Sequence, residues 1–449
     1  MKCTLHNLGC KVNSYETEAM RQLLEAAGYE IVEFGSETAD VYIINTCTVT
    51  NIADRKSRQM LHRARKMNPD GIVIAAGCYV QSAREILEQD EAIDIVISNN
   101  KKKSITEIVN DYINVRNNEK NAPGKDHEAM EYFVDISRET EYEEMGGHVP
   151  VGHTRAYVKI QDGCNQFCSY CIIPYVRGRI RSRSQEAILA EVSELAEAGI
   201  KEVVLTGIHI SSYGKDKNNE GALIELIEAI SKIKGIKRIR LGSLEPGIIT
   251  EEFVERISSN SKVCPHFHLS LQSGCDSVLK RMNRKYTCKQ YFEKCDMLRK
   301  AYKSPALTTD VIVGFPGETE EEFAETVRYL TELNLYEMHI FKYSPRKGTV
   351  AAAMKEQVAP EIKNERSDVL LKLAHDNKTA YEAQFEGCEL EVLVEEVVKK
   401  DNKTYLRGHT ERYMDILIDV GDISMPESFV NSFVYVTYTQ NGGNLPLLL

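Results

Sequence analysis

A strand-like run followed by a helix-like stretch repeats about six times between residues 152 and 385, and this repetition limits the possible fold more than any other feature. The strand-like runs are "RAYVKIQ", "EVVLTG", "RIRLGS", "FHLSLQ", "LTTDVIVG" and "YEMHIFKYS". Successive βα units favour parallel strands closed into a full or partial barrel, with the active face at the carboxyl ends of the strands. We predict an α/β fold in which residues 152–385 form a (βα)6 partial TIM barrel.

Three further regions flank this repeat. Residues 1–113 contain the short apolar runs "VYIINTC", "GIVIAAGC" and "IDIVIS", with charged helical stretches after the first two, which predicts a small doubly wound parallel sheet. Residues 114–151 are polar and acidic, with glycine and proline punctuation, and are predicted to be a linker. Residues 386–449 alternate apolar and polar positions in several short runs, which favours a small antiparallel β-barrel.

Composition matters here mainly for the twelve cysteines. The chain is 42% hydrophobic and 27% charged, as soluble globular proteins are, and it has neither a membrane-length apolar run nor an export signal, so we expect a cytoplasmic protein with no membrane partner. In a reducing compartment, clustered cysteines indicate metal binding or redox chemistry rather than disulfides. The net charge of -11 argues against non-specific coating of nucleic acid, but it leaves room for local basic patches.

The densest cysteine motif follows the first predicted barrel strand. In "QDGCNQFCSYCIIP", Cys164, Cys168 and Cys171 have the spacing C-x3-C-x2-C. Three thiolates on one loop can hold three irons of a cubane cluster and leave the fourth iron open to a small chelating molecule, such as an amino acid. A structural zinc site is the alternative, although such sites normally take four protein ligands.

Three other cysteines are far apart in the sequence but occupy equivalent places in the predicted sheet. Cys10, Cys47 and Cys78 each lie where a predicted strand gives way to its loop. Because ligands of doubly wound sheets bind at the carboxyl ends of the strands, we expect these thiols to meet at one edge. They are typical of an iron-sulfur cluster or of a zinc site that lacks one ligand, while three buried structural thiols are the alternative.

At this point the chain resembles a known family. "GCNQFCSYCIIPYVRGRIRSR" followed by a βα barrel is similar to the radical S-adenosylmethionine (SAM) methylthiotransferases, and the resemblance covers essentially the whole chain. Within that family, "LGCKVNSYETE" and "NTCTVTN" resemble the bacterial branch that modifies N6-threonylcarbamoyladenosine at position 37 of tRNA. The isopentenyladenosine branch usually shows GCQMN in place of GCKVN, and the ribosomal-protein branch shows GCPKN.

The resemblance implies two 4Fe-4S clusters, SAM as cosubstrate and a C-terminal TRAM RNA-binding domain. The cluster on Cys164, Cys168 and Cys171 would pass one electron to SAM, which releases methionine and a 5'-deoxyadenosyl radical that takes hydrogen from C2 of the adenine. Sulfur held at the open iron of a second cluster, on Cys10, Cys47 and Cys78, would be methylated by another SAM and transferred. The electron would come from a low-potential donor such as flavodoxin or ferredoxin.

The resemblance also suggests which residues contact SAM and RNA. Gly207, Ser243, Glu245, Gln272 and Gly314 are expected to hold SAM at consecutive strand ends. Contacts to RNA phosphates are expected from Arg177, Arg179, Arg181 and Arg183, and from the run "KRMNRK" over residues 280–285. Two other functions stay open on the sequence: a methylthiotransferase for a ribosomal protein, and a metal-stabilised RNA-binding protein without catalysis.

Overall fold

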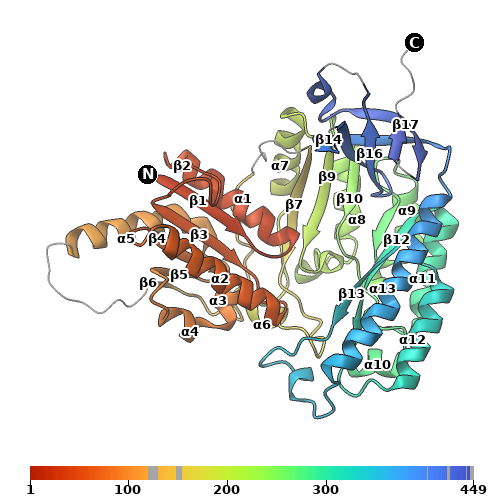
Figure 1. Ribbon diagram of the computed structural model, residues 1–449, viewed down its shortest axis with the longest axis horizontal. Coiled ribbons are helices and arrows are strands. Elements are labelled where there is room, and N and C mark those ends of the chain that lie inside the picture. Colours follow the sequence, from red (N-terminus) through yellow and green to blue (C-terminus); the bar gives the residue numbers. More distant parts are fainter. Residues whose placement is uncertain (120–129, 148–153, 402, 422–424, 441, 445–449) are drawn as a thin grey trace.

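The computed structural model describes residues 1–119, 130–147, 154–401, 403–421, 425–440 and 442–444. Three bodies follow one another along the chain (Figure 1): an N-terminal α/β layer, a central curved sheet with helices outside it, and a small β-barrel at the C-terminal end. Part of the predicted linker, residues 120–129 and 148–151, lies outside the described residues.

The N-terminal sheet has six parallel strands in the order β2-β1-β3-β4-β5-β6. They are β1 (Lys2–Asn7), β2 (Glu30–Ile31), β3 (Val41–Thr46), β4 (Ile72–Gly77), β5 (Ile95–Ile97) and β6 (Met130–Tyr132). The helices between them are α1 (Lys11–Ala26), α2 (Asn51–Met67), α3 (Cys78–Ser82), α4 (Arg84–Glu88) and α5 (Ile105–Glu119), with a 3-10 turn η1 (Lys102–Ser104). One apolar core joins α1 and α5 to one face of the sheet, and another joins α2 to the opposite face, so the doubly wound prediction is confirmed.

Two stretches of the predicted linker belong to this N-terminal body. Helix α5 continues past the predicted boundary at residue 113 to Glu119, and its residues Ile108, Val109 and Tyr112 pack against the sheet. Strand β6, within the predicted linker, pairs in parallel with β5 and extends the sheet by one strand. The predicted linker therefore includes part of the N-terminal fold.

The central body contains the six predicted parallel strands. They are β7 (Arg155–Asp162), β9 (Glu202–Gly207), β10 (Arg238–Leu241), β11 (His266–His268), β12 (Ala306–Val313) and β13 (Glu337–Lys342). They form two sheets, β10-β9-β7-β8 and β11-β12-β13, which a bridge between Leu244 and Leu269 connects. Strand β8 (Arg181–Ser182) is a short antiparallel addition beside β7. Because one apolar core runs through both sheets, and β7 does not pair with β13 in the described residues, the partial barrel is confirmed.

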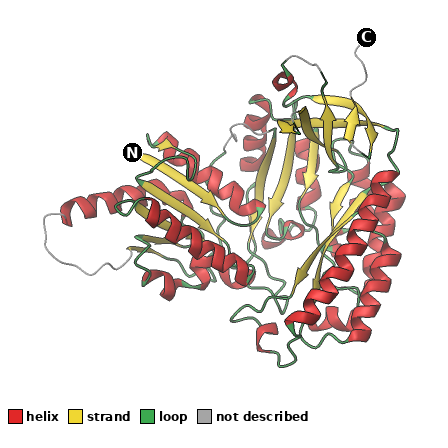
Figure 2. Cartoon of the chain, viewed as in Figure 1, coloured by secondary structure: helices red, strands yellow, loops and turns green. Residues whose placement is uncertain are grey.

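Helices surround the outside of this partial barrel (Figure 2). They are α7 (Gln185–Glu197), α8 (Ala222–Ser231), α9 (Glu251–Ser258), α10 (Asp276–Arg281), α11 (Cys288–Ala301), α12 (Glu320–Leu333) and α13 (Pro360–Ala383), with 3-10 turns η2 (Ile210–Ser212), η3 (Lys215–Lys217), η4 (Pro246–Ile248) and η5 (Ala351–Ala353). The short helix α6 (Ile173–Val176) packs instead against α3 of the N-terminal body. Among the helices of the described residues, none combines the length and the apolar character that a membrane span requires.

The C-terminal strands close into a barrel in the order β14-β15-β16-β18-β17. They are β14 (Glu389–Lys400), β15 (Lys403–Thr410), β16 (Asp415–Asp419), β17 (Phe433–Thr439) and β18 (Gly442–Asn444), with a 3-10 turn η6 (Pro426–Phe429). The pairs are antiparallel, as predicted, apart from the parallel pair of β16 and β18. Ion pairs from Arg155 to Glu395 and from Arg238 to Glu391 fasten this barrel to the amino ends of the central strands.

Candidate functional site

The C-x3-C-x2-C loop lies between β7 and α6, at the carboxyl end of the first barrel strand. The amide of Cys171 donates to the carbonyl of Cys168 at 3.0 Å, and the amide of Cys164 donates to the carbonyl of Gly178 at 3.0 Å. Gly163 enters the loop with a φ of 72°, and a Cβ there would lie 1.8 Å from the carbonyl oxygen of Arg179. Only glycine fits at such a place, so the backbone itself brings the three thiols close together.

Hydrogen-bond donors surround the sulfur atoms of this loop. Arg284 Nη1 donates to Cys168 Sγ at 3.3 Å, and the amide of Gln166 donates to Cys164 Sγ at 3.4 Å. Burial raises the pKa of Cys164 to about 11 and that of Cys171 to about 12, and the nearby Cys168 adds to both increases. A bound metal deprotonates the thiols that coordinate it, so the raised pKa values of the metal-free thiols do not oppose an iron-sulfur cluster, and the donors to sulfur fit one.

The other three cysteines meet at the carboxyl edge of the N-terminal sheet. Thr46 pairs with Gly77 across β3 and β4, which places Cys47 beside Cys78. Gly9 has a φ of 129°, and a Cβ on it would lie 3.2 Å from Cys47 Sγ, so the loop that carries Cys10 approaches closely. Burial raises the pKa of Cys47 to about 11, and Cys78 and Cys10 raise it further. The structure thus brings together three thiols that span 68 positions of the sequence, from Cys10 to Cys78.

A buried arginine connects the two cysteine sites. Arg177 follows α6, directly after the barrel loop, and its Nε donates to Cys78 Sγ at 3.2 Å. Its other nitrogens donate to Asn13 Oδ1 and Glu16 Oε1, each at 2.7 Å, and to Asp162 Oδ2 at 3.1 Å. One side chain therefore contacts a cysteine of the N-terminal edge, helix α1 and strand β7.

Glu16 is the centre of this buried ion network. It accepts from Arg177, Lys159 and Lys102, all of which are buried. Burial alone would raise the pKa of Glu16, but the three cations hold it well below its usual value. Glu16 was missed in the sequence analysis because nothing in "SYETE" marks it apart from an ordinary helix surface residue.

The expected phosphate contacts of three arginines are wrong. Arg177, Arg181 and Arg183 are buried, with exposed fractions of 0%, 1% and 2%. Their guanidinium groups bind internal partners, which are Glu16 and Asp162 for Arg177, backbone carbonyls for Arg181, and Glu144 and Glu191 for Arg183. Of the four arginines, only Arg179 is exposed, and its Cζ lies 4.4 Å from the ring centroid of Phe167. Some residues of a charge run can point inward, and the sequence does not reveal which ones do.

A cavity of about 370 Å³ opens beside the barrel loop. It is lined by the three barrel cysteines, by strand-end residues of the barrel, and by Val49 and Thr50 from the loop after Cys47. Three of the five residues expected to contact SAM lie on its wall, namely Ser243, Glu245 and Gln272. The other two, Gly207 and Gly314, are not among the described residues that line it, and their contacts with SAM stay predictions.

Arg284 orients one wall of this cavity. It donates to Glu245 Oε2 at 2.8 Å as well as to Cys168 Sγ, so it links the carboxylate to the cysteine loop. Burial would raise the pKa of Glu245, but His209 and Arg284 lower it below its usual value. Arg284 belongs to the run "KRMNRK", which we had interpreted as a phosphate contact; this arginine instead points inward.

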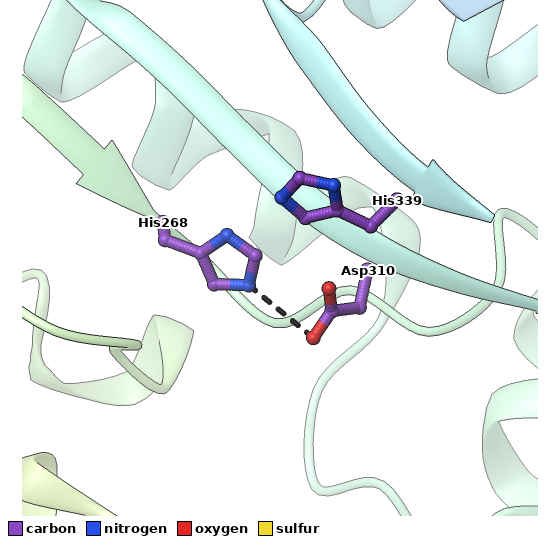
Figure 3. Close-up of side chains that lie close together, drawn as sticks. All are labelled: His268, Asp310 and His339. Atoms are coloured by element: carbon purple, nitrogen blue, oxygen red, sulfur yellow. Dashed lines mark ion pairs between the residues drawn. The ribbon is translucent and has the colours of Figure 1, made fainter. Parts of the chain in front are cut away.

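Two histidines and an aspartate lie close together on neighbouring barrel strands (Figure 3). His268, Asp310 and His339 come from the adjacent strands β11, β12 and β13, and their ligand atoms all lie within 4.8 Å of one another. His268 Nε2 is 3.3 Å from Asp310 Oδ2, and its Nδ1 is 3.0 Å from Thr308 Oγ1. Such a set could hold a divalent cation, but the contact between His268 and Asp310 accounts for the geometry equally well. The sequence does not reveal this group, because strand pairing brings its members together and no local motif links them.

Two family models match the chain. Residues 158–330 match the radical SAM superfamily, and residues 2–98 match the uncharacterized protein family UPF0004. The threonylcarbamoyladenosine tRNA methylthiotransferase MtaB of Bacillus subtilis is 41% identical over 92% of this chain and 89% of its own length. The enzyme of the same name from Thermotoga maritima is 37% identical over 91% of this chain and 89% of its own. The tRNA-2-methylthio-N(6)-dimethylallyladenosine synthase of Thermoanaerobacter pseudethanolicus is 36% identical over 97% and 90%.

Solved structures agree on the fold. The radical S-adenosylmethionine methyltransferase TsrM from Kitasatospora setae, with cobalamin and a [4Fe-4S] cluster bound, superimposes with a TM-score of 0.55 at 16% identity. The match covers 77% of this chain and 76% of that one. The sequence relatives and the family model place the chain in the methylthiotransferase family of the radical SAM superfamily: it is a radical SAM transferase that uses SAM and an iron-sulfur cluster.

Proposed function

We propose that this enzyme adds a methylthio group to C2 of N6-threonylcarbamoyladenosine at position 37 of tRNA, with two 4Fe-4S clusters. The observation that carries the proposal is the pair of three-cysteine sites on either side of Arg177, one in each of the two bodies. Relatives that bear the threonylcarbamoyladenosine name are 36–41% identical to the chain, against 34–36% for relatives named as dimethylallyladenosine synthases.

Each cysteine set would hold one cluster and leave one iron without a protein ligand. A cluster on Cys164, Cys168 and Cys171, with SAM bound beside it, supplies the one-electron chemistry that activates the substrate carbon. Hydrogen bonds to cluster sulfurs tune the reduction potential, and Arg284 on one side and Arg177 on the other are placed to donate them. Second-sphere donors of this kind also fix the orientation of the ligands.

The cavity supplies position and protection from water. Ser243, Glu245 and Gln272 would hold the polar parts of SAM, while Ile208, Ile312 and Phe341 give the wall an apolar side. Gln272 has a φ of 78°, a conformation that only a surrounding structure can impose on a residue other than glycine. The loop with Val49 and Thr50 closes the cavity on the side of the second cysteine site, so the substrate base would lie between the two.

A profile of modified nucleosides tests the proposal. We expect tRNA from a strain without this gene to lose methylthio-threonylcarbamoyladenosine, accumulate threonylcarbamoyladenosine, and regain the modified form with a plasmid copy. An unchanged level of methylthio-threonylcarbamoyladenosine would overturn the choice of substrate. Loss of methylthio-dimethylallyladenosine instead would assign the enzyme to that branch, and an unaltered nucleoside profile would return attention to a protein substrate.

A second experiment tests whether the protein is an enzyme or an RNA-binding protein without catalysis. After anaerobic reconstitution, the protein should contain about eight irons and cleave SAM once it is reduced by flavodoxin, ferredoxin or dithionite. Iron far below two clusters, or SAM that stays intact under these conditions, would favour an RNA-binding protein without catalysis.

A further inference from the structure

Lys11 stands where the N-terminal body meets the central barrel. It follows Cys10 and begins α1, and its Nζ lies 6.0 Å from the ring centroid of Tyr157 on β7. Lys11 is an exposed residue, so a solute can reach it, while burial, Arg240 and Arg155 lower the pKa of its ammonium group. Lys11 therefore lies between Cys10, a member of the N-terminal cysteine site, and Tyr157 on the barrel wall.

Among the described residues, Lys11 has no carboxylate at ion-pair distance, unlike the cations near it. Arg155 pairs with Glu395 at 3.0 Å, and Arg240 pairs with Glu202 at 2.8 Å. Glu202 acts on Lys11 only from beyond ion-pair distance. The cations of the adjacent barrel wall are therefore paired, whereas Lys11 is not.

Positively charged side chains lie near His266. Burial holds the pKa of His266 well below its usual value, and Arg240, Lys11, His268 and His339 lower it further. Asp310 is already paired with His268, and Glu202 with Arg240. An anion that reached Lys11 would therefore find these two carboxylates already paired.

Strand β11 connects the neighbourhood of Lys11 to the cavity beside the barrel cysteines. Asp310 lines that cavity and pairs across β12 and β13 with His339, while His268 stacks on His339 with ring centroids 5.8 Å apart. His266 and His268 lie two residues apart on β11 and so point to the same side of the strand. A nucleobase in the cavity could therefore extend a substituent towards Lys11.

We propose that Lys11 binds the carboxylate of the threonylcarbamoyl group and so selects this nucleoside over an adenosine with an uncharged N6 substituent. The inference rests on the proposed function. A threonylcarbamoyl group carries a carboxylate, whereas a dimethylallyl group is apolar and has no charge. Charge-assisted hydrogen bonds are the strongest that side chains form, and an unneutralised lysine discriminates most sharply between these two substituents.

A substrate pair isolates this contact. Two anticodon stem-loop RNAs would carry threonylcarbamoyladenosine, one with the free carboxylate and one with that group converted to its neutral methylamide. We expect the wild-type enzyme to prefer the free acid by about tenfold or more in kcat/KM, as the loss of one charged hydrogen bond implies. Lys11→Met should lose this preference, mainly through KM for the acid, while its iron content and its KM for SAM stay unchanged.

Two further variants control the test. Lys11→Arg keeps the charge and should keep a preference for the acid. Lys232→Met removes an exposed lysine after α8, on an outer helix, and should behave as the wild type with both RNAs. Lys11→Gln, with a polar side chain of similar length, repeats the measurement if Lys11→Met binds less iron.

Each other result is decisive. If Lys11→Met and Lys11→Gln keep the wild-type preference for the free acid, the inference is wrong. An equal loss on both RNAs would show that Lys11 contacts a phosphate instead, which also overturns it. If the wild type modifies neither RNA, the proposed function fails first, and the two failures are thereby distinguished.

Discussion

The two cysteine sites are built in opposite ways. In the barrel, one loop of eight residues, 164–171, carries all three thiols, and its own backbone hydrogen bonds shape it. In the N-terminal body, the thiols come from the ends of β1, β3 and β4, and strand pairing alone brings them together. A local site tolerates changes elsewhere in the fold, whereas a site assembled by topology depends on the whole sheet and on its contact with the barrel through Arg177.

The largest expected effect comes from removing a ligand of the local site. Cys168→Ala should abolish both SAM cleavage and methylthiolation, because the cluster next to the SAM cavity would be lost. Chromatographic measurement of 5'-deoxyadenosine and of the modified nucleoside checks this. Cys388→Ala, an exposed cysteine outside both sites, is the matched control and should retain both activities. Undiminished SAM cleavage in Cys168→Ala would remove this cysteine from the site.

Arg177 should matter for the interface between the bodies more than for binding RNA. Arg177→Met leaves Glu16 and Asp162 short of one buried cation and should lower the free energy of unfolding by about 3–5 kcal/mol. Arg179→Met, two residues on and exposed, should change it by less than about 1 kcal/mol. Denaturant unfolding of the two apoproteins compares them, and equal effects would contradict the assignment of Arg177 to the buried network.

The glycine beside Cys10 tests how tightly the topological site is packed. Gly9→Ala should cost of order 1–3 kcal/mol and reduce iron at this site only, because its φ of 129° and a Cβ 3.0 Å from Cys47 Cβ both oppose alanine. Iron content and the rate of SAM cleavage measured together give the answer. Gly28→Ala, which shares a positive φ but has nothing within 4 Å of its Cβ, separates the backbone effect from the contact.

The smallest effect is a dependence of stability on pH. The pKa of Glu16 is well below its usual value of 4.5 in the folded protein, so its contribution is fully present above pH 4.5 and is lost as the pH falls towards the folded value. Glu16→Gln should therefore flatten the fall in unfolding free energy below pH 4.5. Denaturant titrations at pH 7, 4.5 and 3.5 check this, and parallel curves for the variant and wild type would contradict it.

The same contrast explains what sequence could predict. The βα repeat gave six strands at their observed places because buried parallel strands are continuous apolar runs between helices, as β3 and β4 also are. The C-x3-C-x2-C loop was visible because its spacing is local. Cys10, Cys47 and Cys78 could be grouped because they occupy the same place after successive strands.

Contacts between the N-terminal body and the barrel could not be predicted from the sequence. Arg177, Arg181 and Arg183 look like a basic patch, and only packing against α1 and the carboxylates around it shows that they point inward. Arg284 was likewise taken as a surface residue of "KRMNRK", yet it contacts Cys168. Helix α5 and strand β6 extend into the predicted linker because their apolar residues find partners on a sheet that is distant in sequence.

We propose that the cysteine site in the barrel loop starts the chemistry and that the site on Cys10, Cys47 and Cys78 delivers the sulfur. Cys10→Ala tests it most directly, in an anaerobic assay of the iron-loaded variant that counts 5'-deoxyadenosine and methylthiolated nucleoside in the same sample. The account predicts that methylthiolation disappears while SAM cleavage stays within about twofold of the wild type, since Cys10 lies outside the barrel loop. Loss of both activities in a folded variant that still binds about four irons would contradict it.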